Sequence, residues 1–306
     1  MGHVTAFLLG VGLAGGCGPR PEDAPLVRTT RADASIRDAG PMDAGPVDTG
    51  PPVIPDEPLE PWDETDAGPL SGLWAVEAVV RARIVVDVES RQLFRLRVLQ
   101  RGRTLRLRTT VCALRLPEVR NVAELAVPEP LERVLHTRAI ETEGEFLSSE
   151  SLEGATFAPE PVALVLGADV GDPFTDPLPT PERPERARDE DDDGHPGVTV
   201  LARTLLCPRP EEAYLALRTV ASFSAVLDGS TDVVEGDVEP RLEWSFLGFS
   251  AECLAAARDL RVEIQPGSRF VARRVGHEQD VDGNGNVSCP ELAWHASRLF
   301  GEAWLP

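Results

Sequence analysis

The chain contains no lysine, a single tyrosine and few aromatic residues of any kind, which together make up 5% of the sequence. Its 30 basic residues are all arginine and are outnumbered by 51 acidic residues, so the formal net charge is −21. Because nucleic-acid binding depends on cations that neutralise phosphates, this balance argues against nucleic acid as a partner. The sequence also lacks Gly-x-Ser-x-Gly, His-Glu-x-x-His and a phosphate-binding glycine loop. These absences favour a protein that acts by binding, with a hydrolase whose site residues are dispersed in the sequence as the alternative.

The N-terminus has the features of an export signal. Its apolar stretch, residues 4–13, is too short to span a bilayer as a helix, and small residues follow it directly. Residues 1–16 are therefore expected to be a signal peptide. Small residues directly before a cysteine resemble a bacterial lipobox. The resemblance implies cleavage before Cys17, acylation of Cys17 and anchoring of the exported protein to a membrane of the cell envelope. Secretion without a lipid is the alternative.

Residues 17–70 form a predicted tether. The segment repeats Asp-Ala-Gly-Pro units and is rich in proline, aspartate, alanine and glycine. Such a composition cannot bury enough apolar surface to offset the entropy lost on ordering. Proline and like charges keep a chain of this kind extended. We expect a disordered stalk that holds a folded domain away from the membrane.

The composition changes at Gly72, where a mainly β domain is predicted for residues 71–275. Residues 94–108 alternate apolar and arginine side chains on both sides of a turn at Gly102, which indicates an antiparallel hairpin with one arginine-lined face. Other candidate strands, separated by Gly, Pro and Asp clusters, are residues 73–88, 162–166, 198–206, 214–227, 241–249, 260–264 and 269–275. A short helix is expected near residues 252–258. The pattern favours an antiparallel barrel or sandwich.

The last segment, residues 276–306, is expected to hold an acidic loop and a helix that packs on the β domain. Leu292, Ala296, Leu299, Phe300 and Ala303 share one face of that helix. The order of elements, with Gly72-Leu73-Trp74 opening the first strand and a helix closing the chain, resembles lipocalin-type barrels. That resemblance implies a barrel whose interior binds an apolar small molecule. A protein partner at the cell surface is the other binding role that we consider.

Four cysteines lie in the predicted folded part, namely Cys112, Cys207, Cys253 and Cys289. An even number in an exported chain predicts two disulfides, and neither zinc-site spacing nor Cys-x-x-Cys occurs. Four cysteines allow three connectivities. We favour Cys112–Cys207 and Cys253–Cys289.

Residues 280–291, here called the Asp280 loop, resemble an EF-hand calcium loop over its full length. In that family, positions 1, 3, 5, 7, 9 and 12 bind calcium and position 6 is glycine, which is Gly285 here. The resemblance implies a calcium site made by Asp280, Asp282, Asn284, the carbonyl of Asn286, Ser288 and Glu291. A strand precedes the loop where an EF-hand has its entering helix. Ser288 and Glu291 also match a helix capping box, and both roles can coexist.

Residues 189–200, here called the Asp189 loop, begin in the same way. Asp189, Asp191 and Asp193 alternate before Gly194, but position 12 is Val200. The stretch resembles the shorter Asp-x-Asp-x-Asp-Gly calcium loops of secreted repeat proteins. A solvated acidic loop is the alternative. Because all these ligands are oxygens and none is a thiolate, the ion expected in either loop is calcium.

Overall fold

The computed structural model describes residues 67–84, 86–116, 123–146, 151–301 and 304. The predicted signal peptide, Cys17 and all but the end of the predicted tether lie outside the described residues, as does Ala303. Among the described residues, no helix is both long and apolar enough to cross a membrane.

The elements are mainly antiparallel strands. The strands are β1 Gly72–Arg83, β2 Asp87–Arg101, β3 Thr104–Arg115, β4 Ala123–Ala126, β5 Ala139–Phe146, β6 Thr156–Pro159, β7 Val162–Leu166, β8 Val198–Thr204, β9 Glu211–Val226, β10 Val233–Phe249, β11 Glu263–Ile264 and β12 Arg269–Val275. The helices are α1 Glu129–Thr137, α2 Cys289–Phe300 and two 3₁₀ segments, η1 Pro184–Arg186 and η2 Glu252–Asp259. The predicted hairpin, the last strand and the C-terminal helix are confirmed. The predicted segment 73–88 instead contains β1, a turn and the start of β2.

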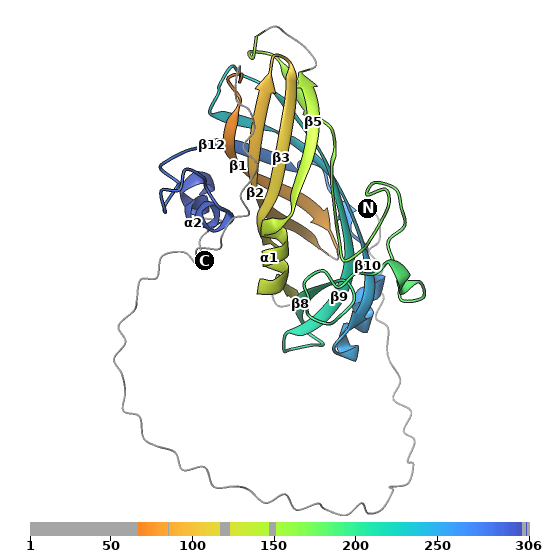
Figure 1. The fold of residues 1–306 in the computed structure, drawn as a ribbon. Coiled ribbons are helices and arrows are strands. Elements are labelled where there is room, and N and C mark those ends of the chain that lie inside the picture. The colour runs from red at the N-terminus through yellow and green to blue at the C-terminus, as the bar shows by residue number, and fades with distance from the viewer. Residues whose placement is uncertain (1–66, 85, 117–122, 147–150, 302–303, 305–306) are drawn as a thin grey trace, which may run out of the picture. The chain divides into compact units, whose positions relative to one another are not determined.

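The sheet closes on itself. Taken in chain order, β1, β2, β3, β5, β6, β9, β10 and β12 each pair antiparallel with the next, and β12 returns to β1. The closing pair runs from Leu73 opposite Val275 to Val79 opposite Arg269. The predicted mainly β fold is confirmed, and of its two forms the structure is a barrel (Figure 1). Strands β7 and β8 pair with β9, β4 extends the sheet beyond β8, and β11 pairs with β1.

Period-two alternation decides which side chains fill the barrel. The inward positions of β1 and β2 are apolar, and they include Trp74, Val76, Phe94 and Val98. Alternate residues of β9 and β12 complete the same cluster, in which Phe270 packs edge to face on Phe223. Burying this surface is the main stabilising contribution to the fold.

The start of β1 and the end of β12 are joined by one arginine. The Arg274 guanidinium lies 4.7 Å from the centre of the Trp74 ring. It also donates hydrogen bonds to the carbonyl oxygens of Ser71, at 2.6 Å, and of Pro69. The Trp74 indole nitrogen donates to the Leu70 carbonyl at 3.0 Å. These contacts fix the ends of the two strands whose pairing closes the barrel.

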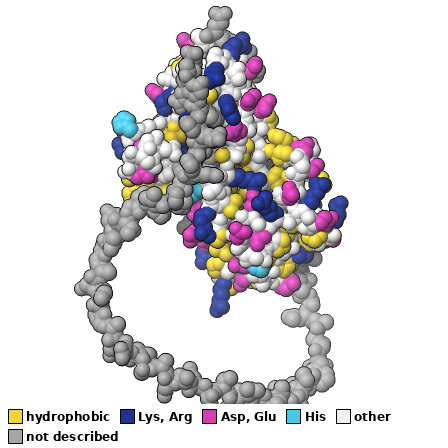
Figure 2. Space-filling view, in the orientation of Figure 1, with side chains coloured by type: hydrophobic (Ala, Val, Ile, Leu, Met, Phe, Trp, Pro, Cys, Tyr) yellow, Lys and Arg dark blue, Asp and Glu magenta, His cyan; other side chains and the backbone are white. Residues whose placement is uncertain are grey.

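Arginines of the β2–β3 hairpin point to the outer side of the wall, where Arg106 and Arg108 lie beside an acidic residue of β5 while Arg95 is buried. Glu141 on β5 accepts hydrogen bonds from Arg106, at 2.7 Å, and from Arg108. Those bonds, the one from Arg106 first, lower the pKa of the Glu141 carboxyl. Acidic and basic side chains are likewise mixed over the visible face in Figure 2. Cross-strand charge pairing thus accounts for the predicted arginine-lined face.

Helix α2 covers the outside of the barrel wall formed by β1, β2 and β3 (Figure 1). Its Leu292 and Ala296 are fully buried against Ala75 of β1 and Leu93 of β2. A β-bulge in β3 leaves Cys112 without a partner residue on β2. Alternation along β3 already places Cys112 on the outer side of the wall, under α2, because it has the same facing as Arg106 and Arg108; the bulge turns the next residue, Ala113, to that side as well.

The two disulfides are Cys112–Cys289 and Cys207–Cys253, so the predicted connectivity Cys112–Cys207 and Cys253–Cys289 is wrong. Cys112 packs outside the barrel wall, whereas Cys207 belongs to a cluster on the inner side. A sheet therefore separates the two residues that sequence reasoning paired. The presence of two disulfides indicates an oxidising compartment outside the cytoplasm.

Removing the Cys112–Cys289 bridge by a double change to alanine should destabilise the protein more than removing Cys207–Cys253. The bridges close segments of 177 and 46 residues. Loop-closure entropy then gives a loss of about 5 kcal/mol for the first and about 4 kcal/mol for the second. Denaturant unfolding of the two double variants measures this order. A larger loss from the Cys207–Cys253 change would contradict it.

Candidate calcium loops and apolar chamber

The Asp280 loop connects β12 to α2 and wraps around its own carboxylates. Asp280 accepts hydrogen bonds from the backbone amides of Asn284 and Gly285, at 3.1 and 2.8 Å. Asp282 accepts from the Asn284 amide at 3.0 Å. Gly283 and Gly285 have φ angles of 71° and 84°, in the left-handed region that glycine adopts without strain. The first half of the loop therefore turns sharply enough to bring alternate side chains together.

The second half of the loop is held by Glu291. Its Oε1 accepts from the amides of Val281 and Asp282, at 2.6 and 3.2 Å, and its Oε2 accepts from the amide and the hydroxyl of Ser288, at 2.7 and 2.8 Å. Although burial opposes ionisation, these hydrogen bonds outweigh it and lower the pKa of Glu291. The predicted capping box is confirmed, with the Ser288 side chain also accepting from the Glu291 amide.

The three carboxylates among the six predicted ligands come together in the structure. Asp280, Asp282 and Glu291 each offer a carboxylate oxygen, and these oxygens lie within 4.8 Å of one another. The Asn284 side-chain oxygen accepts from the amide of Asn286, at 2.7 Å, and the Ser288 hydroxyl is used in the cap. A cluster of hard oxygen ligands suits calcium. Coordination by both oxygens of Glu291 requires its bonds to the loop amides to rearrange.

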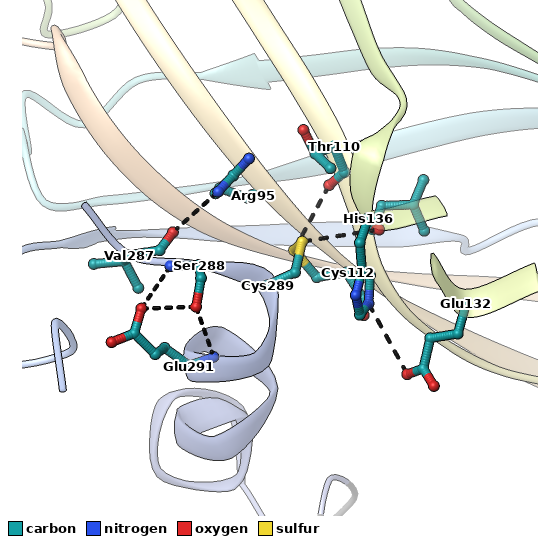
Figure 3. Close-up of a disulfide and its surroundings, with 10 residues drawn as sticks. Arg95, Thr110, Cys112, Glu132, His136, Val287, Ser288, Cys289 and Glu291 are labelled. Carbon is teal, nitrogen blue, oxygen red and sulfur yellow. Dashed lines mark hydrogen bonds and ion pairs between the residues drawn. A yellow bond between two sulfur atoms is a disulfide. The ribbon is translucent and has the colours of Figure 1, made fainter. Parts of the chain in front are cut away.

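The end of this loop is attached to the barrel wall (Figure 3). The Val287 carbonyl accepts a hydrogen bond from Arg95 at 3.4 Å, and Val287 itself is buried. The next residues are the cap Ser288 and then Cys289, which is bonded to Cys112 of β3. An ion in the loop would thus lie between β12, the last strand, and helix α2, which is bonded to β3 through the disulfide.

The Asp189 loop has the same turn as the Asp280 loop. Asp189 accepts from the amides of Asp193 and Gly194, at 3.2 and 2.9 Å, which are the fifth and sixth residues of the loop. The φ angles at Asp192 and Gly194 are 55° and 89°, matching the left-handed pair in the Asp280 loop. Asp193 accepts from the His195 amide at 2.9 Å, as Asn284 does from the residue two positions on. The two sequences therefore build one local conformation.

The two loops close differently. Where the Asp280 loop uses Glu291, the Asp189 loop uses Thr199, whose amide donates to Asp191 at 2.9 Å and whose hydroxyl donates to Asp193. The Asp189, Asp191 and Asp193 carboxylates again lie within 4.8 Å of one another. Burial raises the pKa of Asp191, and the charges of Asp193 and Asp189 raise it further. Sequence reasoning had no signal for Thr199, because a threonine at the start of a strand is common.

A separate feature is the apolar space in the barrel. A cavity of about 70 Å³ lies among the inward side chains around Trp74, Phe94 and Phe270. That volume is small for a ligand, since small-molecule sites occupy roughly 300–1,000 Å³. Phe94 packs against this cluster and also against a second apolar cluster, built from α1, β7, β8, β9 and η2.

The second cluster borders a larger apolar space, here called the chamber. Its volume is about 370 Å³. It is lined mainly by aliphatic and aromatic side chains, which are Ile84, Ala123, Leu125, Val200, Ala202, Thr204, Leu205, Leu206, Ala213, Leu215, Trp244, Phe246, Cys253, Leu254, Ala256, Ala257 and Leu260. Ala213 and Leu215 share a face of β9 with Phe223, which points into the barrel. The sequence did not reveal this site, because its residues come from six separate segments.

The chamber has an apolar rim. Leu205 and Leu206 follow β8 and are 73% and 71% exposed. Both leucines also line the chamber, so its apolar surface continues out to the solvent at this edge.

Comparisons with known proteins found no matching family model, no matching curated protein and no matching solved structure. The case for function therefore comes from the geometry of this chain.

Changing Glu291 to glutamine and to alanine should separate its two roles. Without calcium, Glu291→Ala should lose about 1 kcal/mol of stability because the helix cap is lost, and Glu291→Gln should lose less because glutamine also serves in a capping box. With calcium at ten times the dissociation constant of the Asp280 loop, ion binding to this loop should add about 1.4 kcal/mol to the stability of the wild type, and both variants should lack most of that increment. Thermal melting in chelator and in calcium measures these differences.

Glu278→Gln is the matched control, since Glu278 is exposed and precedes the loop. It removes the same charge and should respond to calcium as the wild type does. If Glu291→Gln and the wild type respond equally to calcium, Glu291 is not a calcium ligand and the loop is only a turn followed by a helix cap.

Proposed function

We propose that this protein is an exported, lipid-anchored binding protein that holds an apolar small molecule in the chamber at the end of its barrel. The observation that carries the proposal is the chamber itself, with apolar walls, a volume of about 370 Å³ and exposed leucines at its rim. Small-molecule sites are concave and mostly apolar, and they have volumes in this range. A concave apolar space of this kind fits a small molecule better than it fits the flat surface of a protein partner.

The arrangement of the barrel supports a carrier of the lipocalin type. Trp74 stands at the start of the first strand, consecutive strands form a closed ring, and α2 packs on the outside of the wall. This order is what the resemblance in Gly72-Leu73-Trp74 implies. A long-chain fatty acid is a suitable representative ligand, since its chain is apolar and its carboxylate can remain at the rim in water.

Calcium has a structural part in this proposal. Bound to the Asp280 loop, it would hold α2 and the end of β12 together on the wall of the barrel. None of the loop's residues is among those that line the chamber, and so we assign it to stability rather than to ligand recognition. A dissociation constant of about 10⁻⁴–10⁻³ M would suffice outside the cell, where calcium is plentiful.

The ligand proposal can be tested with a fluorescent polyene fatty acid. Ala257 lies on η2 and lines the chamber, so Ala257→Phe should fill part of it and weaken binding about tenfold, or about 1.4 kcal/mol. Ala255 lies on the same segment but is not part of the lining, so Ala255→Phe should leave affinity within about twofold. Fluorescence titration measures both. Absence of binding to the wild type, or an equal loss in the two variants, would refute the chamber as the site.

The anchor proposal rests on Cys17 and its preceding small residues. Mass spectrometry of the mature protein from its native host should find a diacylated cysteine at the N-terminus. Cys17→Ser should yield a protein without acyl chains that no longer fractionates with membranes. An unmodified wild-type chain that begins at another residue would contradict the anchor.

A further inference from the structure

One buried carboxylate oxygen in the Asp189 loop receives no hydrogen bond from the residues that the structure describes. Asp191 is only 7% exposed, and its Oδ1 has no donor among them. Its Oδ2 accepts from the Thr199 amide at 2.9 Å. A charged oxygen taken out of water without a partner is strongly destabilising, so native proteins provide such atoms with a donor or an ion.

The surroundings of this oxygen indicate what its partner is. Asp191 lies in the cluster with Asp189 and Asp193, where oxygens of all three carboxylates are within 4.8 Å. A water molecule could donate to Asp191 Oδ1, but it would not offset the repulsion among three carboxylates. A divalent cation does both. Because the ligands are hard oxygens, calcium fits better than a transition metal.

We infer that the Asp189 loop is a second calcium-class cation site, in which Asp189, Asp191 and Asp193 bind the ion and Thr199 takes the closing place that Glu291 has in the Asp280 loop. Asp191 Oδ1 contributes the buried ligand. The matching φ angles and amide contacts of the two loops bring the first, third and fifth residues together in the same way. The site does not depend on the chamber having a ligand.

The position of this site gives it a structural consequence. Thr199 belongs to β8, and its neighbour Val200 lines the chamber. Glu190 accepts hydrogen bonds from the Gly167 amide, at 2.6 Å, and from Arg138, which directly follows α1. The loop therefore joins β8 to the ends of β7 and α1, three elements of the second apolar cluster. An ion here would hold one wall of the chamber in place.

Calorimetry with calcium alone tests the inference in protein carrying Asp280→Asn, so that the first loop lacks a ligand. One binding site should remain. Adding Asp191→Asn should weaken it about tenfold or more, since the variant keeps the acceptor for Thr199 but removes the charge. Adding Asp192→Asn instead is the matched control. Asp192 is an exposed neighbour at φ 55°, where asparagine is well tolerated, and affinity should stay within about threefold.

Thermal melting checks that the variants are folded. In chelator, Asp191→Asn should melt at or above the temperature of Asp192→Asn, because it removes an uncompensated buried charge. Added calcium should raise the melting temperature of Asp192→Asn more than that of Asp191→Asn. Absence of calcium heat in folded Asp280→Asn protein, or equal affinity in the two double variants, would overturn the inference.

Discussion

The pairing of the first and last strands of the barrel is the constraint on which the rest of the structure depends. Unless β12 joins β1, the inner faces of eight strands do not enclose a common interior. Arg274, stacked on Trp74 and bonded to carbonyls just before β1, fixes this junction at one end. Closure also removes the open edges that would leave backbone groups of β1 and β12 without partners.

The features outside the ring strengthen the same closure. The Cys112–Cys289 bridge ties α2 to β3, while the Asp280 loop ties α2 to the end of β12. The helix thus links β12, the last strand of the ring, to β3, one of the first. Cys207–Cys253 joins the segment after β8 to η2 beside the chamber.

Sequence patterns predicted the elements whose own residues carry the signal. The β2–β3 hairpin alternates Leu and Val with Arg, and α2 combines a capping box with an apolar stripe, so both were predicted correctly. Strand β5 was missed because its inward positions run Ile140, Thr142, Gly144 and Phe146, so the polar threonine and the glycine interrupt the apolar alternation. Its outward glutamates lie opposite the arginines of β3 and pair with them, and the sequence of β5 alone does not show this pairing. Helix α1 and the short strands β4 and β6 also went unpredicted, whereas β11 lies within the predicted strand 260–264.

The candidate sites, like the strands, were predictable only where the residues that form them lie close together in the sequence. Both acidic loops were found from residue spacing, because their candidate ligands are neighbours in the chain. The disulfide connectivity was wrong because it depends on which side of the wall each cysteine lies, and the local sequence around Cys207 and Cys253, which lie outside the strands, does not show their side. The chamber combines residues from Ile84 to Leu260, and Thr199 closes the Asp189 loop from another element. Such features follow from the closed topology and not from any local stretch of sequence.

The central claim is that an apolar molecule binds inside the end of the barrel. Nuclear Overhauser contacts between methyl groups of the protein and the chain protons of a bound fatty acid test it most directly. Leu215 and Val200, which line the chamber, should both show contacts to the chain, whereas Val281, exposed on the Asp280 loop, should show none. Contacts restricted to the exposed Leu205 and Leu206, without any to Leu215 or Val200, would place the ligand on the surface and contradict the account.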